Sequence, residues 1–176
     1  MILHAIIKNT AKGLLLVFGL ARKPIGLENL PKGEGCILVC NHVSDLDPIK
    51  LGALIPGYVR YLAKKELFGT RFTNWFLTNL GAIPLNRDSA DVGAFKAAED
   101  AISMGELLVI FPEGGRRKVF DVNKGKKGAE RLAAKMGCKV VPAGIKGRRI
   151  AIGKPMEGSP STLEIMNGIN EILATI

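Results

Sequence analysis

Short apolar runs alternate with segments of helical periodicity along most of this 176-residue chain, and this alternation constrains its fold more than any other feature. The apolar runs predict strands at residues 36–40, 59–63, 81–85, 107–111, 140–145 and 149–152. The helical pattern predicts helices at residues 48–54, 72–80, 90–104, 128–136 and 161–176. Such alternation is typical of an α/β fold, so we expect a mostly parallel central sheet with helices on both faces.

The length fits one folded domain of ordinary core size, which we place at residues 23–176 behind an N-terminal segment of residues 1–22. In this segment His4, Lys8 and Lys12 recur every fourth residue, so on a helix they would form a basic stripe opposite apolar side chains. The longest apolar run is far shorter than the roughly 20 residues that a membrane span needs. We therefore expect an amphipathic helix lying in a membrane interface. The alternative is a helix that packs its apolar face on the domain core.

The composition favours an anionic partner but does not by itself choose its class. Lys and Arg number 25 against 16 Asp and Glu, a net charge of +9, which suits nucleic acid, phospholipid surfaces or phosphorylated metabolites. The aromatic content of 6% and the lack of a recognisable nucleic-acid module argue against nucleic acid. Hydrophobic residues make up 47%, which fits a protein that touches lipid. The three cysteines have no metal-ligand spacing, so we expect reduced thiols and no metal site.

The segment Asn41-His42-Val43-Ser44-Asp45-Leu46-Asp47 directly follows the first apolar run, so His42 is expected at the carboxyl end of a buried strand. A neutral imidazole there can act as a general base, with Asp47 fixing its tautomer. Asp47 precedes a proline and so also suits the start of a helix. Two alternatives remain open: Asp45 as the partner of His42, or a loop histidine beside an aspartate that only caps a helix.

Two further segments place polar groups after predicted strands. Arg87 ends the third strand and offers a planar fork suited to phosphate. Glu113, Gly114, Gly115 and Arg116 follow the fourth strand, where the glycines let backbone N–H groups approach a ligand and the arginine can bind an anion. The alternatives are an exposed loop arginine paired with a neighbouring aspartate, and a glycine turn with solvated charges.

Together and in this order, four motifs resemble those of the glycerolipid acyltransferase family, in particular its bacterial 1-acyl-sn-glycerol-3-phosphate (lysophosphatidic acid) acyltransferases. They are Asn-His-x-x-x-x-Asp at 41–47, Gly-x-Ile-x-x-x-Arg at 81–87, Phe-Pro-Glu-Gly-x-Arg at 111–116 and Val-Pro-x-Gly at 141–144. The chain departs from the family pattern at Gly115, where threonine is usual, and at Arg117, where serine is frequent. These departures bear on the identity of the acceptor.

The resemblance implies acyl transfer from acyl-CoA or acyl-carrier-protein to the free hydroxyl of 1-acyl-glycerol-3-phosphate, forming phosphatidic acid without a bound cofactor. It implies that His42 is the base and that Asp47 orients it. The residues it assigns to the phosphate and glycerol of the acceptor are Arg87, Glu113, Gly114 and Arg116. The secondary contributors it suggests are Asn41, Lys65, Gly115 and Lys127.

The resemblance also predicts the surroundings of the protein. We expect a peripheral, monotopic protein on the cytoplasmic face of a phospholipid membrane, which meets lysophosphatidic acid and an acyl donor but no nucleic acid. The basic side chains of residues 118–131 would contact coenzyme A phosphates, the carrier protein or anionic lipid, unless they are simply solvated. The alternative functions are transfer to another acceptor, such as glycerol-3-phosphate or a different lysolipid, and lipid binding without catalysis.

Overall fold

The computed structural model describes the backbone of residues 2–86 and 91–176, and the side chains of residues 5–86 and 91–176. The strands are β1 (Cys36–Cys40), β2 (Val59–Lys64), β3 (Ala82–Leu85), β4 (Leu107–Ile110), β5 (Val140–Lys146) and β6 (Arg149–Ile152). The longer helices are α1 (Ile2–Val17), α2 (Asp47–Leu54), α3 (Arg71–Asn79), α4 (Val92–Ser103), α5 (Gly128–Met136) and α6 (Thr162–Ala174). Three short 3₁₀ helices are η1 (Leu27–Asn29), η2 (Lys65–Phe68) and η3 (Val122–Lys124). Each strand and helix predicted after residue 22 is therefore present, with ends shifted by at most two residues, and the helix expected within residues 1–22 spans Ile2–Val17.

The strands form a single sheet in the order β3-β2-β4-β1-β5-β6. The first five strands in this order pair in parallel, and only β6 pairs antiparallel, with β5. The prediction of a mostly parallel α/β fold is thus confirmed. The order places β1 between β4 and β5, so the carboxyl ends of these three strands meet at one edge of the sheet. This is where open α/β sheets place their ligands.

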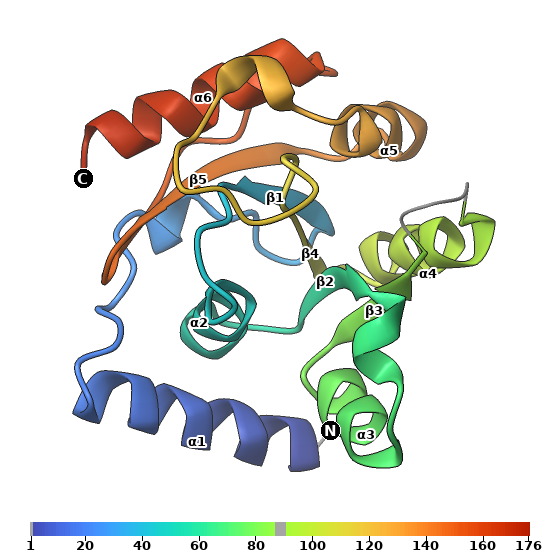
Figure 1. Cartoon of the computed structure of the whole chain (residues 1–176). Coiled ribbons are helices and arrows are strands. Elements are labelled where there is room, and N and C mark those ends of the chain that lie inside the picture. Colours follow the sequence, from blue (N-terminus) through green and yellow to red (C-terminus); the bar gives the residue numbers. More distant parts are fainter. Residues whose placement is uncertain (1, 87–90) are drawn as a thin grey trace.

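Helices cover both faces of the sheet (Figure 1). Helices α4, α5 and α6 lie on one face, whereas α2 and α3 lie on the other and α1 lies beyond α2. Because side chains alternate along a strand, β1 contributes side chains to two separate cores, one on each face of the sheet. Leu38 packs in the core that contains Leu51 of α2, whereas Ile37 and Val39 pack in the core that contains Ile165 of α6. All five residues of β1 are buried, as its continuous apolar run predicts for a central parallel strand.

Helix α1 packs on α2 through the side that carries Lys8 and Leu15, and Leu15 is buried. The Lys8 Nζ donates to the backbone oxygens of Ile55 and Gly57, each at 2.5 Å. Burial, assisted by the charge of Lys12, lowers the pKa of Lys8 to about 8. Part of the predicted basic stripe therefore faces the domain. The expectation that α1 contacts a membrane stays a prediction.

No helix in the described part of the chain is long and apolar enough to cross a bilayer.

A glycine next to the central strand makes a contact that the sequence pattern does not reveal. A Cβ on Gly35, directly before β1, would lie 1.9 Å from the backbone oxygen of Ile102 at the end of α4. We expect Gly35→Ala to lower the free energy of unfolding by about 1–3 kcal/mol, because the chain must shift to relieve the overlap. Chemical denaturation of the purified variant measures this.

Gly52→Ala is the matched control, because a Cβ at this position in α2 would meet no heavy atom within 4 Å. It should leave stability unchanged or raise it by up to about 1 kcal/mol, the helix preference of alanine over glycine. Equal stability of the two variants would contradict the close approach of α4 to the start of β1.

Candidate active site

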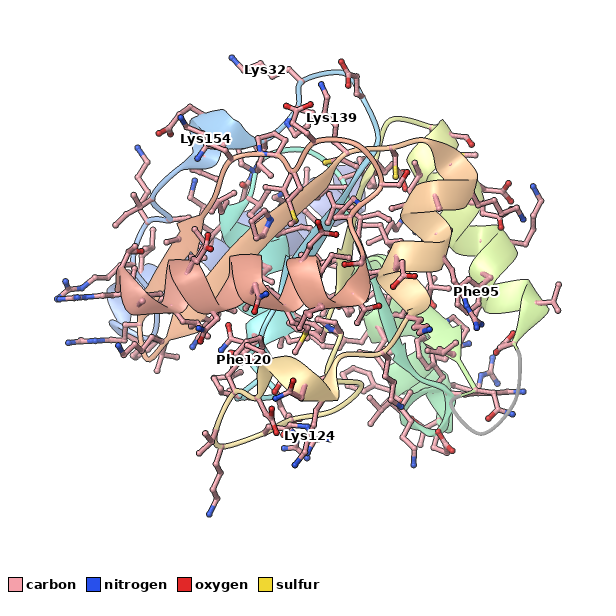
Figure 2. The ribbon with its side chains drawn as sticks, turned by 90° about the horizontal axis from the view of Figure 1, so that it is seen from above. Lys32, Phe95, Phe120, Lys124, Lys139 and Lys154 are labelled. Atoms are coloured by element: carbon pink, nitrogen blue, oxygen red, sulfur yellow. The ribbon has the colours of Figure 1, made fainter. Side chains whose placement is uncertain are left out.

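The site lies at the carboxyl edge of the sheet. In Figure 2, Phe120 and Lys124 from the loop after β4 mark this edge, whereas Lys32, Lys139 and Lys154 mark the opposite one. Strand β1 ends at Cys40, and a short loop then turns into α2, which begins at Asp47 with Pro48 in its first turn. This single turn brings the imidazole of His42 to the carboxylate of Asp47.

The His42 Nδ1 lies 3.1 Å from the Asp47 Oδ2. The Asp47 side chain is fully buried, and the His42 side chain is 12% exposed. Because the imidazole reaches solvent and the carboxylate does not, the pair has the layout of a base with an orienting acid behind it. The sequence left Asp45 open as the partner, but its carboxylate is 77% exposed and pairs instead with Arg116.

The loop itself holds the carboxylate of Asp47 in place. The backbone N–H groups of Val43 and Ser44 both donate to its Oδ2, at 2.8 Å and 2.7 Å. Burial acts to raise the pKa of Asp47, but the hydrogen bonds from His42, Ser44 and Val43 outweigh it and hold the pKa below its ordinary value. The carboxylate is therefore ionised at neutral pH.

The other carboxyl oxygen, Asp47 Oδ1, has no hydrogen bond within the described part of the chain. The Nζ of the buried Lys50 lies 3.9 Å away and donates to the backbone oxygen of Gly147 in the β5–β6 turn, at 3.1 Å. Lys50 therefore joins the start of α2 to the end of β5 and gives the buried carboxylate a nearby positive charge.

Asn41 fixes the end of β1 against β5. Its amide group donates to the backbone oxygen of Ile145 at 2.9 Å and accepts from the Ile145 N–H at 2.8 Å. The side chain is 3% exposed, so both of these bonds are shielded from water. The Asn41 side chain thus continues the hydrogen bonding between β1 and β5 beyond the last residue of β1, and this fixes where His42 begins the turn.

Glu113 fixes the same loop from the side of β4. Its Oε2 accepts from the backbone N–H of His42 at 2.9 Å, and its Oε1 is buried without a hydrogen bond in the described residues. Burial raises the pKa of Glu113, partly offset by the His42 N–H and by the charge of Arg117. The resemblance assigned Glu113 to the glycerol of the acceptor. In the structure its hydrogen bond is to the backbone of His42.

The loop after β4 also contacts His42 directly. The ring of Phe111 stacks on the imidazole with centroids 4.2 Å apart and an interplanar angle of 22°. The Arg117 N–H donates to the His42 backbone oxygen at 2.8 Å. The Gly114 N–H donates to the Phe111 oxygen in a turn that requires a positive φ of 69°. This N–H is therefore engaged, whereas the Gly115 N–H is the donor in none of the backbone hydrogen bonds of the described chain.

Two hollows flank this centre. The first has a volume of about 330 Å³ and is lined by both apolar and basic residues. They include Phe111, Phe95, Leu62, Lys127 and Arg131. The second, of about 380 Å³, includes Asn41, Glu113, Arg117, Lys118 and Lys146. The first suits an acyl chain beside phosphate groups, and the second suits an anion.

The remaining predicted residues are more peripheral. Arg116 is 57% exposed and forms a hydrogen-bonded ion pair with Asp45. Lys65 opens η2 after β2 and belongs to the lining of neither hollow. Arg87 lies outside the described residues. No cluster of His, Cys, Asp or Glu able to hold a metal ion occurs in the part of the chain that was described.

Sequence reasoning missed the positions of three residues. Phe111 was matched to a motif, but no role was inferred for it. Arg117 was noted only as a departure from the family pattern, although its backbone bonds to His42. Lys50 follows Asp47 by three residues, and this helical spacing was the available signal for a contact between them.

The sequence matches the family described as "Acyltransferase" over residues 22–146. The 1-acyl-sn-glycerol-3-phosphate acyltransferase of Bacillus subtilis is 35% identical over 121 residues, which cover 68% of this chain and 60% of the relative. The chloroplastic 1-acyl-sn-glycerol-3-phosphate acyltransferase BAT2 of Brassica napus is 32% identical over 167 residues, covering 84% and 48%. The chain thus spans between about half and three fifths of the length of these relatives.

Among solved structures, the fold resembles the crystal structure of the 1-acyl-sn-glycerophosphate acyltransferase from Thermotoga maritima. The TM-score is 0.75 at 25% identity, and the match covers 98% of this chain and 77% of that one. The similarity therefore includes the sheet and the helices on both of its faces. With the family match across residues 22–146 and the motifs at the ends of β1 and β4, this chain belongs to the acyltransferase family.

Proposed function

We propose that this protein transfers an acyl group from a thioester, acyl-CoA or acyl-carrier-protein, to the free hydroxyl of 1-acyl-glycerol-3-phosphate, forming phosphatidic acid. The observation that carries the proposal is the 3.1 Å contact between His42, in the loop after β1, and the buried, ionised Asp47 at the start of α2. The activity for which the B. subtilis and B. napus relatives are named supports the choice of acceptor.

In the proposed reaction the hydroxyl oxygen of the acceptor attacks the thioester carbonyl. Asp47 accepts the Nδ1 proton of His42 in a hydrogen bond, so that the Nε2 carries the free lone pair and removes the hydroxyl proton. Collapse of the tetrahedral intermediate breaks the carbon–sulfur bond, and the same Nε2 returns its proton to the departing thiolate. The Gly115 N–H is the candidate donor to the oxyanion.

Transfer is direct, without an acyl-enzyme. Cys36 and Cys40 are free but buried in the core below the sheet. Burial raises the pKa of Cys36 to about 12 and that of Cys40 well above its ordinary value. Because a thiol attacks as its thiolate, neither cysteine is suited to act as the nucleophile.

The hollow beside Phe111 binds the acyl donor, and two arginines bind the acceptor. The apolar hollow beside Phe111 takes the acyl chain of the donor, and Lys127 and Arg131 at its wall meet the donor's phosphates or an acidic carrier protein. Arg116, together with Arg87, holds the phosphate of the acceptor. Arg116 is free to do so, because its exposed pair with Asp45 is weak and a dianionic phosphate can displace it.

The protein acts as a peripheral enzyme on the cytoplasmic face of the membrane. The large apolar side chains of α1 that face away from α2 support this placement, since they leave an apolar helix face uncovered in the domain.

His42→Ala should lower acyl transfer by at least about 100-fold, because general base catalysis contributes this much or more. Release of free thiol from acyl-CoA in the presence of lysophosphatidic acid measures the rate. Parallel assays with glycerol-3-phosphate and other lysolipids identify the preferred acceptor. His4→Ala, which changes the only other histidine, is the control. Turnover like that of wild type in His42→Ala would refute the assignment.

Asp47→Asn should lower the rate of acyl transfer by about 10⁴-fold, because the amide does not hold the productive tautomer of His42. The thiol-release assay measures this.

The same substitution tests whether Asp47 is ionised, through the pH dependence of stability. Because the pKa of Asp47 is lowered on folding, its charge stabilises the fold above the unfolded carboxyl pKa of about 3.9. This contribution is lost as the pH falls through the folded value. The stability gap between wild type and Asp47→Asn, measured by urea denaturation, should therefore shrink below about pH 4; a constant gap would contradict an ionised Asp47.

Arg116→Gln should raise the KM for the phosphorylated acceptor about tenfold or more, with little effect on the KM for the donor, because a charged hydrogen bond to phosphate is lost. Asp45→Asn should lower the same KM two- to fivefold, because it removes the competing exposed ion pair. Steady-state kinetics against each substrate measure both effects. If neither variant changes the KM for the acceptor, the phosphate is held elsewhere.

A further inference from the structure

The turn between β5 and β6 forms a strongly basic hollow at the carboxyl edge of the sheet. This hollow, of about 420 Å³, is lined by Arg22, Lys146, Arg148, Arg149 and Ile176. Its described lining thus contains four cationic side chains and no acidic one. The Lys146 Nζ donates to the backbone oxygen of Ile176 at 2.6 Å. None of the ion pairs between described residues includes Arg22, Arg148 or Arg149. Such a hollow suits a phosphate group.

Large apolar side chains lie next to this hollow, at the end of α1. Val17 is 81% exposed and Phe18 is 69% exposed, and Leu20 is also exposed. The segment is attached to the basic turn by two hydrogen bonds: Arg148 Nη1 donates to the Gly19 oxygen at 3.4 Å, and the Arg22 N–H donates to the Arg148 oxygen at 2.9 Å. The apolar end of α1 and the basic turn therefore form one continuous patch, although their residues are more than 120 positions apart in sequence.

The orientation of α1 leaves the basic residues of the β5–β6 turn as the positive charge beside its exposed end. Lys8, the middle member of the helix's basic stripe, points into the domain and donates its hydrogen bonds to backbone oxygens after α2. The outward end of the helix is left with apolar side chains, and the positive charge beside them is supplied by a distant strand pair. An apolar segment bordered by arginines and lysines matches the acyl region and the phosphates of a lipid surface.

We propose that the docking surface made by Val17, Phe18, Leu20, Arg22, Lys146, Arg148 and Arg149 binds an anionic phospholipid bilayer. Lipid phosphates occupy the basic hollow, and the apolar side chains enter the boundary between headgroups and acyl chains. The occupant is a bilayer, because a soluble phosphate compound would leave the exposed Val17 and Phe18 in water.

The docking surface lies close to the catalytic pair. Lys50, which is 3.9 Å from Asp47, donates to Gly147 in the same turn, and Lys146 lines both this basic hollow and the one that contains Glu113. A lipid acceptor in the bilayer would thus sit beside the loop that carries His42. This part of the inference rests on the proposed function, whereas binding to vesicles does not.

Sedimentation of the full chain with vesicles tests the docking surface. At low salt the protein should bind vesicles of phosphatidylcholine mixed with phosphatidylglycerol and bind pure phosphatidylcholine far more weakly. Arg148→Gln with Arg149→Gln should lower the partition coefficient on the anionic vesicles about 30-fold, taking each basic residue near such a surface as roughly fivefold. Phe18→Ser should also weaken binding, and salt should weaken that of wild type.

The matched control is Lys32→Gln with Lys154→Gln, which removes the same charge at the opposite edge of the sheet (Figure 2). This variant should bind nearly as well as wild type. Equal losses in the two double variants would show that only net charge matters and would overturn the proposal. Loss of binding on Phe72→Ser with Trp75→Ser alone would place the contact on the exposed aromatic residues of α3 and would overturn it as well.

Acyl transfer to a short-chain lysophosphatidic acid, dissolved as monomers, separates this inference from the proposed function. Arg148→Gln with Arg149→Gln should keep the wild-type rate on the monomeric acceptor and lose rate on the acceptor held in anionic vesicles. Unchanged rates on both would count against the docking surface. Absence of transfer by wild type would instead refute the proposed function, while the vesicle binding would still be decided by sedimentation.

Discussion

The buried carboxylate of Asp47 is the interaction on which the rest of the site depends. One of its oxygens receives three hydrogen bonds, from the imidazole of His42 and from the two backbone N–H groups that follow it. A carboxylate withdrawn from water is costly unless such bonds compensate it, and here they keep it charged. The same contacts that keep Asp47 charged also hold the loop, so the position of His42 and the ionisation of Asp47 are set together.

The sheet order gives this loop its rigid surroundings. Because β1 lies between β4 and β5, the residues after its last position are held from both sides. Asn41 bonds to β5 through both ends of its amide, and Glu113, after β4, accepts the N–H of His42. Phe111 covers one face of the imidazole. A general base that must keep its geometry through two proton transfers benefits from neighbouring side chains that are anchored to the central strands.

The proposed chemistry and the proposed lipid contact share one edge of the molecule. His42, Arg116 and Arg117 follow strands that end at this edge, and the β5–β6 turn at the same edge lines the basic hollow beside the end of α1. In the proposed reaction the acceptor carries a phosphate headgroup and an acyl chain. The proposed lipid contact would therefore place an acceptor held in a bilayer next to the proposed base.

The sequence by itself determined the strands and helices after residue 22 to within two residues, the parallel α/β class and the family, because hydrophobic periodicity and motif spacing are local properties of the chain. It placed His42 at the end of a strand but could not choose between Asp45 and Asp47, since both lie within reach along the loop. Only the tertiary structure decided that choice, through the hydrogen bonds that bury Asp47 and the partner that draws Asp45 away. It also turned Lys8 inward and brought the arginines of the β5–β6 turn to α1. These outcomes depend on which distant backbone groups a side chain meets, and that is fixed by the packing of strands and helices far apart in sequence.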